Sequence, residues 1–271
     1  KRQGSFTDVS KIRVREGDTI SAIAFANTKK TVCFFTNLGG AYVMRFDDVE
    51  STTGYGKPVQ SYFSFSDGEK IIGIAAHDPR SLPAVPDDAD PAEGPPFGIG
   101  ITYSGRIIRF PLAGHVDPSQ KKGRRFARLQ GNDTVMAVEV CAGTEMVSLA
   151  TKKGRALCFP VSEVSVLKGA GKGVTAIKLD SGDSIHAFGL TEENMGGVTI
   201  TTPQGRDEVV RPNKYTSSRA TKGRSIIKRG SFKAWERPMI RYDQQFKNDD
   251  ATGEGEELSL IHISEPTRQP C

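Results

Sequence analysis

Residues 149–188 read LATKKGRALCFPVSEVSVLKGAGKGVTAIKLDSGDSIHAF and decide the fold. The stretch holds four short runs rich in apolar residues. A turn at Gly154, a basic glycine loop at 168–173 and a turn at Gly182 separate these runs. Short β-rich runs bounded by glycine turns are typical of strands joined by hairpins. The stretch therefore predicts one unit of four short strands.

Copies of this unit recur along the chain. The glycines of the first hairpin turn, Gly39, Gly105, Gly154 and Gly205, are 66, 49 and 51 residues apart. A basic-loop series (Gly4, Gly56, Gly123, Gly171, Gly223) has a similar period and stretches across the same place. A repeat of about 50 residues with four strands is typical of a propeller blade. We predict an all-β, propeller-like wheel of about five four-stranded blades, incomplete at the N-terminus.

Three segments depart from the repeat. Residues 78–96 contain six prolines and predict a surface insertion or interblade linker, with a functional lid as the alternative. Residues 1–240 are expected to form the domain, and 241–257 an acidic, flexible tail. Residues 258–271 begin LSLIHISEPTR, which resembles the translation of a transposon-end sequencing adapter. We set them aside as non-native. Because the chain opens on Lys1, we expect an interior fragment of a longer protein.

Composition excludes several classes of protein. Hydrophobic residues make up 37% of the 271 residues and charged residues 25%, as in globular domains. No run of about 18 apolar residues occurs, so no membrane span is predicted. The four cysteines lie far apart and predict buried free thiols in a reducing cytoplasm. The four histidines show no spacing typical of metal ligands, so no zinc site is expected.

Charge is distributed unevenly. Residues 98–230 carry 21 Lys and Arg against 11 Asp and Glu, a net charge of +10, whereas both flanking parts are negative. A positive middle is typical of a polyanion-binding surface, with an ordinary solvated basic surface as the alternative. Repetition on a wheel would place the basic loops along one rim, as a track for DNA phosphates. The candidate DNA-binding residues are Lys57, Lys121, Lys122, Arg124, Arg125, Lys152, Lys153, Arg155, Lys168, Lys172, Arg219, Lys222 and Arg224.

Two other function classes make different demands on a propeller. A scaffold that binds a protein partner needs apolar or acidic rim loops. A propeller enzyme needs carboxylates or histidines that converge on the central channel. The sequence shows neither pattern, which favours DNA binding; the protein-binding scaffold stays as the alternative.

The repeats resemble a known family. The segments FFTNLGGAYV (34–43), DGEKII (67–72), LATKKGR (149–155) and GKGV (171–174) are similar to the C-terminal domain of the A subunit of bacterial type IIA topoisomerases. That family comprises the A subunits of DNA gyrase and of topoisomerase IV. The resemblance covers residues 1 to about 235, and four repeats in register make it specific.

The resemblance implies a β-pinwheel, whose blades exchange a strand and whose basic rim binds and bends duplex DNA. It also implies that the cleavage tyrosine, the metal site and the ATPase lie elsewhere in the parent enzyme. We therefore expect no catalytic residue and no cofactor in this chain, with ATP and Mg²⁺ used by the parent. The implied partners are duplex DNA, the A subunit's breakage-reunion domain as a homodimer, and the ATPase B subunit. The implied location is the bacterial cytoplasm, on the chromosome.

One family motif separates the two enzymes. Gyrase carries a basic box, Gln-Arg-Arg-Gly-Gly-Lys-Gly, in its first blade. Here Lys1-Arg2-Gln3-Gly4 holds that position and departs from the box. The loop at 120–125, QKKGRR, is closer in character but belongs to a later repeat. The sequence leaves gyrase-like and topoisomerase IV-like activity open.

Overall fold

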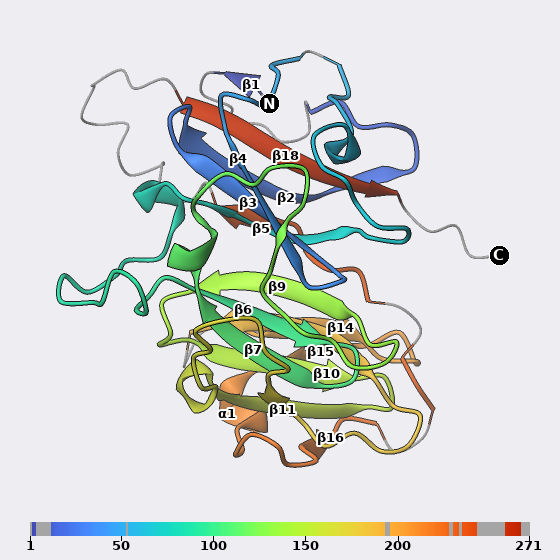
Figure 1. Ribbon diagram of the computed structural model, residues 1–271. Helices are drawn as coiled ribbons and strands as arrows, with labels where there is room; N and C mark the ends of the chain where they lie inside the picture. The colour runs from blue at the N-terminus through green and yellow to red at the C-terminus, as the bar shows by residue number, and fades with distance from the viewer. Residues whose placement is uncertain are drawn as a thin grey trace, which may run out of the picture.

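The chain folds as a series of small antiparallel sheets stacked side by side (Figure 1). The computed structural model describes residues 2–3, 12–52, 54–192, 196–227, 230–232, 235–242 and 258–266. Helix is confined in these residues to one turn, α1, and four short 3-10 turns. The predicted all-β class is confirmed.

The strands follow the predicted periodicity. Their bounds are β1 Arg2–Gln3, β2 Asp18–Asn27, β3 Thr31–Thr36, β4 Gly40–Arg45, β5 Ile71–Ala76, β6 Phe97–Thr102, β7 Arg106–Pro111, β8 Arg124–Arg125, β9 Val135–Cys141, β10 Met146–Thr151, β11 Arg155–Pro160, β12 Val174–Thr175, β13 Ile185–Thr191, β14 Val198–Thr201, β15 Asp207–Val210, β16 Arg224–Ser225, β17 Ile240–Tyr242 and β18 Leu258–Pro266. The helical turns are η2 Val59–Ser61, η3 Pro79–Ser81, η4 Leu112–His115, η5 Val161–Glu163 and α1 Pro212–Tyr215.

Three consecutive blades have the same topology. Their strand orders are β5-β3-β4-β8, β9-β6-β7-β12 and β13-β10-β11-β16. In each sheet the fourth strand has two residues and comes from the next repeat, so the strand exchange that the resemblance implied is present. Glycine precedes each exchanged strand. A Cβ on Gly173 would lie 2.3 Å from the Ile107 carbonyl oxygen, so the chain can approach the strand that closely only at glycine.

Three details of the sequence-based prediction are wrong. The residue equivalent to Gly123 and Gly223 is Gly173 rather than Gly171, since Gly173 directly precedes the exchanged strand. The run 59–65, whose place in the second repeat predicts a strand, instead begins with η2, and its aromatic residues pack on the core beside Tyr42. Residues 12–14 were also expected to be a strand and lie outside any element. Apolar content alone does not distinguish a strand from a packed loop.

The N-terminal blade is completed by strands from the other end of the chain. Its order is β1-β18-β2-β17, with β17 parallel to β2 and β18 antiparallel to it. Strand β18 lies where β3, β6 and β10 lie in the other blades. It has a β-bulge at the equivalent place in its pairing with the neighbouring strand. The bulge follows the pairs Phe35↔Gly73, Ile101↔Ala137, Ala150↔Ala187 and Ile263↔Ala22. Residues 258–266 thus form part of the fold; the adapter origin of 258–271 stays a prediction.

The centre of the wheel is packed by backbone and by one ion pair. Strands β5 and β9 approach so closely that a Cβ on Gly73 would lie 2.5 Å from the Val138 carbonyl oxygen. The Arg237 guanidinium donates to the Ile72 carbonyl (2.7 Å) and pairs with Glu139 (3.3 Å). Since Arg237 follows the last repeat, this contact ties the end of the wheel to two of its inner strands.

Buried thiols and apolar side chains fill the space between sheets. Cys33, Cys141 and Cys158 are free and buried, as predicted; Cys271 lies outside the described residues. Burial raises the pKa of all three thiols, that of Cys158 to about 11, so they are protonated at neutral pH. Within the described residues, no helix is long and apolar enough to cross a membrane.

Candidate nucleic-acid interface

The most basic loop, residues 120–125, is fixed at its C-terminal end and open to solvent along its length. Strand β8 pairs with β4, Arg124 opposite Ala41 and Arg125 opposite Gly40. Both arginines are exposed, as are Lys121 and Lys122. The Arg124 guanidinium donates to the Asp117 carbonyl (2.6 Å), and no described acidic side chain forms an ion pair with any of the four. Lys121, Lys122 and Arg125 therefore remain available on this loop, whereas Arg124 also holds the loop to the Asp117 carbonyl.

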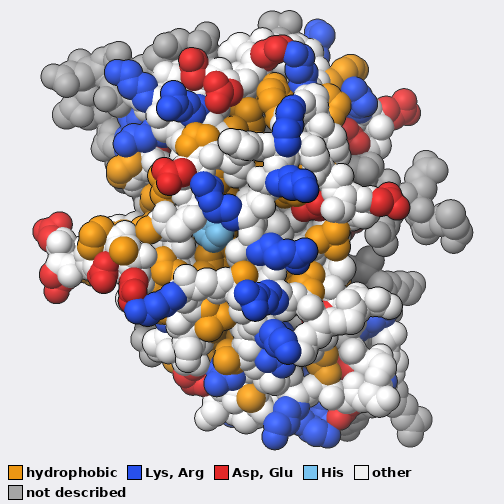
Figure 2. Space-filling view, viewed as in Figure 1, with side chains coloured by type: hydrophobic (Ala, Val, Ile, Leu, Met, Phe, Trp, Pro, Cys, Tyr) orange, Lys and Arg blue, Asp and Glu red, His pale blue; other side chains and the backbone are white. Residues whose placement is uncertain are grey.

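Backbone hydrogen bonds join the segment just after each of the exchanged strands β8 and β12 to the basic loop of the next repeat. The Arg128 N–H donates to the Gly171 carbonyl (2.9 Å), in loop 168–173. The Lys178 N–H in turn donates to the Thr221 carbonyl (2.9 Å), in loop 219–224. The three loops thus form one continuous edge. Figure 2 shows Lys and Arg side chains following one another down the face of the molecule in this view.

Loop 168–173 carries one exposed cation and one that an acid already holds. The Lys168 ammonium lies 2.6 Å from the Glu93 carboxylate, which belongs to the insertion at 78–96. Lys172 is exposed, and its carbonyl accepts a hydrogen bond from the Arg106 Nε (2.8 Å). Lys57, in the second repeat, forms an ion pair with Glu50.

Loop 219–224 uses its cations within the protein. The Arg219 guanidinium donates to the Thr175 carbonyl (2.6 Å) and the Glu163 carbonyl (3.1 Å). The Arg224 side chain donates to the Lys214 carbonyl (2.8 Å). The Lys222 ammonium lies 2.7 Å from Asp180. Each of these three side chains braces the loop against neighbouring parts of the protein.

The hairpin-turn residues Lys152, Lys153 and Arg155 lie against the same edge. Asp180 pairs with Arg155 at 3.8 Å as well as with Lys222, and so links the hairpin turn to loop 219–224. The Lys222 hydrogen bond and charge, followed by the charge of Arg155, lower the pKa of Asp180. Lys153 donates to the Ser181 carbonyl (2.5 Å), whereas Lys152 is exposed. The structure thus brings together the hairpin turn and the basic loop of the next repeat.

The sequence-based prediction missed three basic residues at this edge. Arg128 and Lys178 are exposed and occupy equivalent places just after the exchanged strands. Arg106 donates to the Gly173 carbonyl (2.7 Å) as well as to that of Lys172. Lys228, although outside the described residues, continues the 50-residue spacing of Arg128 and Lys178. This regular spacing could have identified the pair from the sequence alone.

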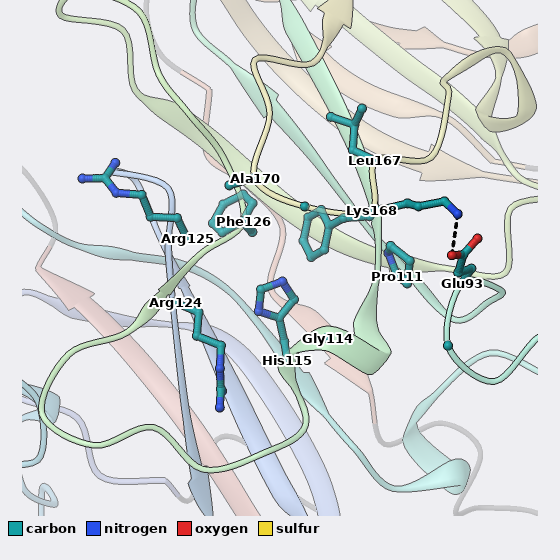
Figure 3. A pocket seen from close by; sticks show the side chains of 13 residues that line it. Glu93, Pro111, Gly114, His115, Arg124, Arg125, Phe126, Leu167, Lys168 and Ala170 are labelled. Atoms are coloured by element: carbon teal, nitrogen blue, oxygen red, sulfur yellow. Dashed lines mark ion pairs between the residues drawn. The ribbon is translucent and has the colours of Figure 1, made fainter.

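A cavity of about 320 Å³ lies between loops 120–125 and 168–173 (Figure 3). The side chains of Phe110, Phe126 and His115 line its interior. The Arg124, Arg125 and Lys168 side chains point away from one another at its margin. Because these cations diverge, they suit an extended chain of phosphates better than one small anion.

The histidines His77, His115 and His186 are neutral at physiological pH. Burial lowers the pKa of His77 and His115 to about 4, and that of His186 is also lowered. Across the part of the chain that the structure describes, no three His, Cys, Asp or Glu side chains lie together as a set of metal ligands.

Comparison with known proteins agrees with this geometry. The DNA gyrase A subunit of Haloquadratum walsbyi is 27% identical over 193 residues, which are 70% of this chain and 22% of that protein. The DNA gyrase A subunit of Escherichia coli K12 is 26% identical over 222 residues, 81% of this chain and 24% of that protein. The chain therefore spans about a quarter of the length of the curated relatives it matches.

Solved structures share the fold. The C-terminal domain of DNA topoisomerase IV aligns with a TM-score of 0.68 at 21% identity, covering 80% of this chain and 64% of that one. The Escherichia coli ParC C-terminal domain aligns with a TM-score of 0.59 at 20% identity, covering 74% and 78%. A sequence model described as "DNA gyrase C-terminal domain, beta-propeller" matches residues 30–78, 101–142 and 145–192, just over half of the chain. The protein is therefore a member of the family of DNA gyrase A C-terminal domains.

Proposed function

We propose that this domain binds duplex DNA along its basic edge and bends or wraps it, largely without regard to sequence. The observation that carries the proposal is the joining of three basic loops, one per repeat, into one edge by backbone hydrogen bonds. Lys and Arg on such an edge contact phosphates, which position and bend DNA but carry no base code. A curved series of such contacts favours DNA that follows the curve.

The basic loops contribute unequally to this proposal. Loop 120–125 offers four cations without a described acidic partner, and Lys172, Lys152, Arg128 and Lys178 extend the exposed charge along the edge. Arg219, Lys222 and Arg224 support the edge from within, since their side chains are engaged by neighbouring groups. DNA binding would therefore centre on loop 120–125.

The same proposal places the domain in the A subunit of a type IIA topoisomerase. Its partners would be the A subunit's breakage-reunion domain, as a homodimer, and the ATPase B subunit, on the chromosome in the bacterial cytoplasm. DNA cleavage, ATP and Mg²⁺ would belong to those other parts of the enzyme. The described residues fit no metal ion, since they hold no cluster of metal-ligating side chains. The domain's contribution would be to present DNA in a fixed path.

A salt titration of duplex binding tests the proposal. Neutralising Lys121, Lys122, Arg124 and Arg125 to Gln should weaken binding about tenfold or more near 0.1 M salt. It should also reduce the slope of log K against log salt by roughly 0.9 for each lost phosphate contact. A variant with Lys29 and Lys30 changed to Gln is the control, because these exposed lysines precede β3 at the end away from its hairpin turn. Equal slopes for the wild type and the fourfold variant would contradict the proposal.

A wrapping assay distinguishes bending from wrapping. Relaxed circular DNA is incubated with the domain, treated with a nicking-closing topoisomerase and analysed for linking number. A change in linking number would support a gyrase-like wrap, whereas binding without a change would support a topoisomerase IV-like role.

A further inference from the structure

The insertion between the second and third repeats carries a concentration of negative charge. Within residues 78–96, Asp78 is buried and bound by the Arg80 guanidinium (2.9 Å), so this pair is internal. The rest of the insertion contains no basic residue and four carboxylates. We call residues 87–93 the acidic segment; its carboxylates belong to Asp87, Asp88, Asp90 and Glu93.

The acidic segment lies against the basic edge. Its Glu93 carboxylate is 2.6 Å from the Lys168 ammonium, and Glu93 and Ala92 form part of the wall of the cavity beside loop 120–125 (Figure 3). The hydrogen bond and the charge of Glu93 raise the pKa of Lys168 most. The charge of the nearby Asp90 raises it further. The Asp90 carboxylate also accepts the Ala92 N–H (2.8 Å) and the Glu93 N–H (3.2 Å), which orients the turn that presents Glu93.

The contact is of a kind that another anion can displace. The side chains of Lys168 and Glu93 are 76% and 48% exposed, and ion pairs so open to water contribute little to stability. The insertion is held elsewhere: Asp78 accepts the Asn27 N–H (2.8 Å), and the Ser81 hydroxyl donates to the Phe25 carbonyl (2.5 Å). The chain then enters β6 at Phe97. The acidic segment can therefore leave Lys168 without disturbing either anchored end.

We propose that the acidic segment is an intramolecular competitor for DNA, whose Glu93 carboxylate occupies the anion position at Lys168 that a phosphate of bound DNA takes. This inference rests on the proposed function, since it assigns a regulator to the same basic edge. A carboxylate and a phosphodiester each present anionic oxygens to an ammonium, so one substitutes for the other. Binding at loop 168–173 then requires release of the segment, whereas loop 120–125 is accessible from the start.

Single-charge variants test the competition. Glu93→Gln should raise duplex affinity roughly two- to fivefold at about 50 mM salt, since an exposed ion pair no longer has to be broken. The salt slope should stay close to that of the wild type, because Lys168 contacts one phosphate in both complexes. Asp88→Asn is the matched control: it removes the same charge from the same segment, and the structure gives Asp88 no ion pair with a described residue. Its affinity should stay close to that of the wild type.

A second background removes the cation. In a Lys168→Ala variant, Glu93→Gln should leave both affinity and salt slope unchanged. Equal effects of Glu93→Gln and Asp88→Asn would overturn the inference, because net charge alone would then account for them. So would an unchanged duplex affinity in Glu93→Gln.

These results are separable from the test of the proposed function. A wild-type domain that binds DNA through loop 120–125 but ignores Glu93→Gln keeps the proposed function and overturns the competitor. A domain that binds no duplex overturns both. Melting temperatures of the variants should match the wild type within error, since both acidic residues are exposed.

Discussion

Loops 120–125 and 219–224 occupy equivalent places two repeats apart, yet they use their charges differently. Both follow a helical turn, η4 or α1, and both lead into an exchanged strand, β8 or β16. Arg124 and Arg224 behave alike, since each donates to a backbone carbonyl. The difference lies in the other cations: the first loop keeps its lysines in solvent, whereas the second directs Arg219 and Lys222 to carbonyl groups and Asp180. Equivalent sequence positions in a repeat therefore share a backbone role but not an electrostatic one. Four experiments can break or sharpen this difference.

Replacing the glycine that precedes the exchanged strand is expected to have the largest effect on stability, and to have it in both loops. Gly223 has φ of +64°, and a Cβ there would lie 2.3 Å from the Ala156 carbonyl oxygen. Gly223→Ala should lower the free energy of unfolding by roughly 2–4 kcal/mol. Gly123→Ala, with its nearest contact at 2.7 Å, should cost somewhat less. Urea denaturation measures both, and Gly169→Ala is the control because nothing lies near its Cβ position. Unchanged midpoints would refute close packing of the exchanged strand.

The pH dependence of stability should distinguish the two residues that end the helical turns before these loops, His115 and Tyr215. His115 ends η4 beneath the first loop, and burial, then the charge of Arg124, lowers its pKa to about 4. The unfolded chain binds a proton near pH 6.5, so folding stability should fall as pH drops from about 6.5 to 4, by on the order of 3 kcal/mol. His115→Phe keeps the aromatic contacts with Phe35 and Phe110 and should remove this share of the acid loss, leaving the similar share of His77.

Tyr215 holds the corresponding place at the end of α1. Burial and the Glu208 contact raise its pKa, so it stays uncharged through the acid range. Tyr215→Phe should therefore leave the acid dependence unchanged, as followed by chemical denaturation across pH. An acid loss as large in His115→Phe as in the wild type would count against the assignment to His115.

Single cations should separate stability from DNA affinity. Arg219→Ala leaves the Thr175 and Glu163 carbonyls without their guanidinium donor and should cost about 1–2 kcal/mol of stability, with a small change in DNA affinity. Lys122→Ala should do the reverse: stability should stay within about 0.5 kcal/mol and duplex affinity should fall. Thermal melts and salt titrations on the same samples give both quantities. If both variants lost affinity equally, the two loops would be equivalent after all.

Releasing a held cation should have the smallest effect. Asp180→Asn weakens the ties to Lys222 and Arg155, so duplex affinity should rise about two- to threefold at low salt. Asp207→Asn removes one charge from β15 and is the comparison for net charge alone. An affinity gain of the same size in both variants would remove the special role of Asp180.

The architecture could be predicted from sequence because period and turns carry it. The hairpin glycine Gly39 has positive φ and lies against Ala127, so the fold requires glycine at the recurring position that defined the repeat. The exchanged strands could not be found in this way, since two residues give no alternation to detect. Only the family resemblance implied them.

The candidate site was only partly predictable. Counting charges identified the loops and favoured the cluster 121–125, but only three-dimensional contacts show that Arg219 is occupied. The acidic partner of Lys168 lies 75 residues earlier in sequence, in an insertion without periodicity. Long-range pairs of this kind leave no local signal in the sequence. The regular 50-residue spacing of Arg128 and Lys178, in contrast, can be read from the sequence.

Strand β2 also gives the wheel a seam. Its two neighbours, β17 and β18, come from the opposite end of the chain, whereas the other blades are closed by strands close in sequence. The β2 amides that bond to β17 or β18 can therefore exchange with solvent only after the C-terminal segments depart, so local opening there reports an event far along the chain. Because β18 repeats the bulge of the other blades, the backbone register of the pairing, rather than one particular side-chain sequence, defines which strand can pair with β2.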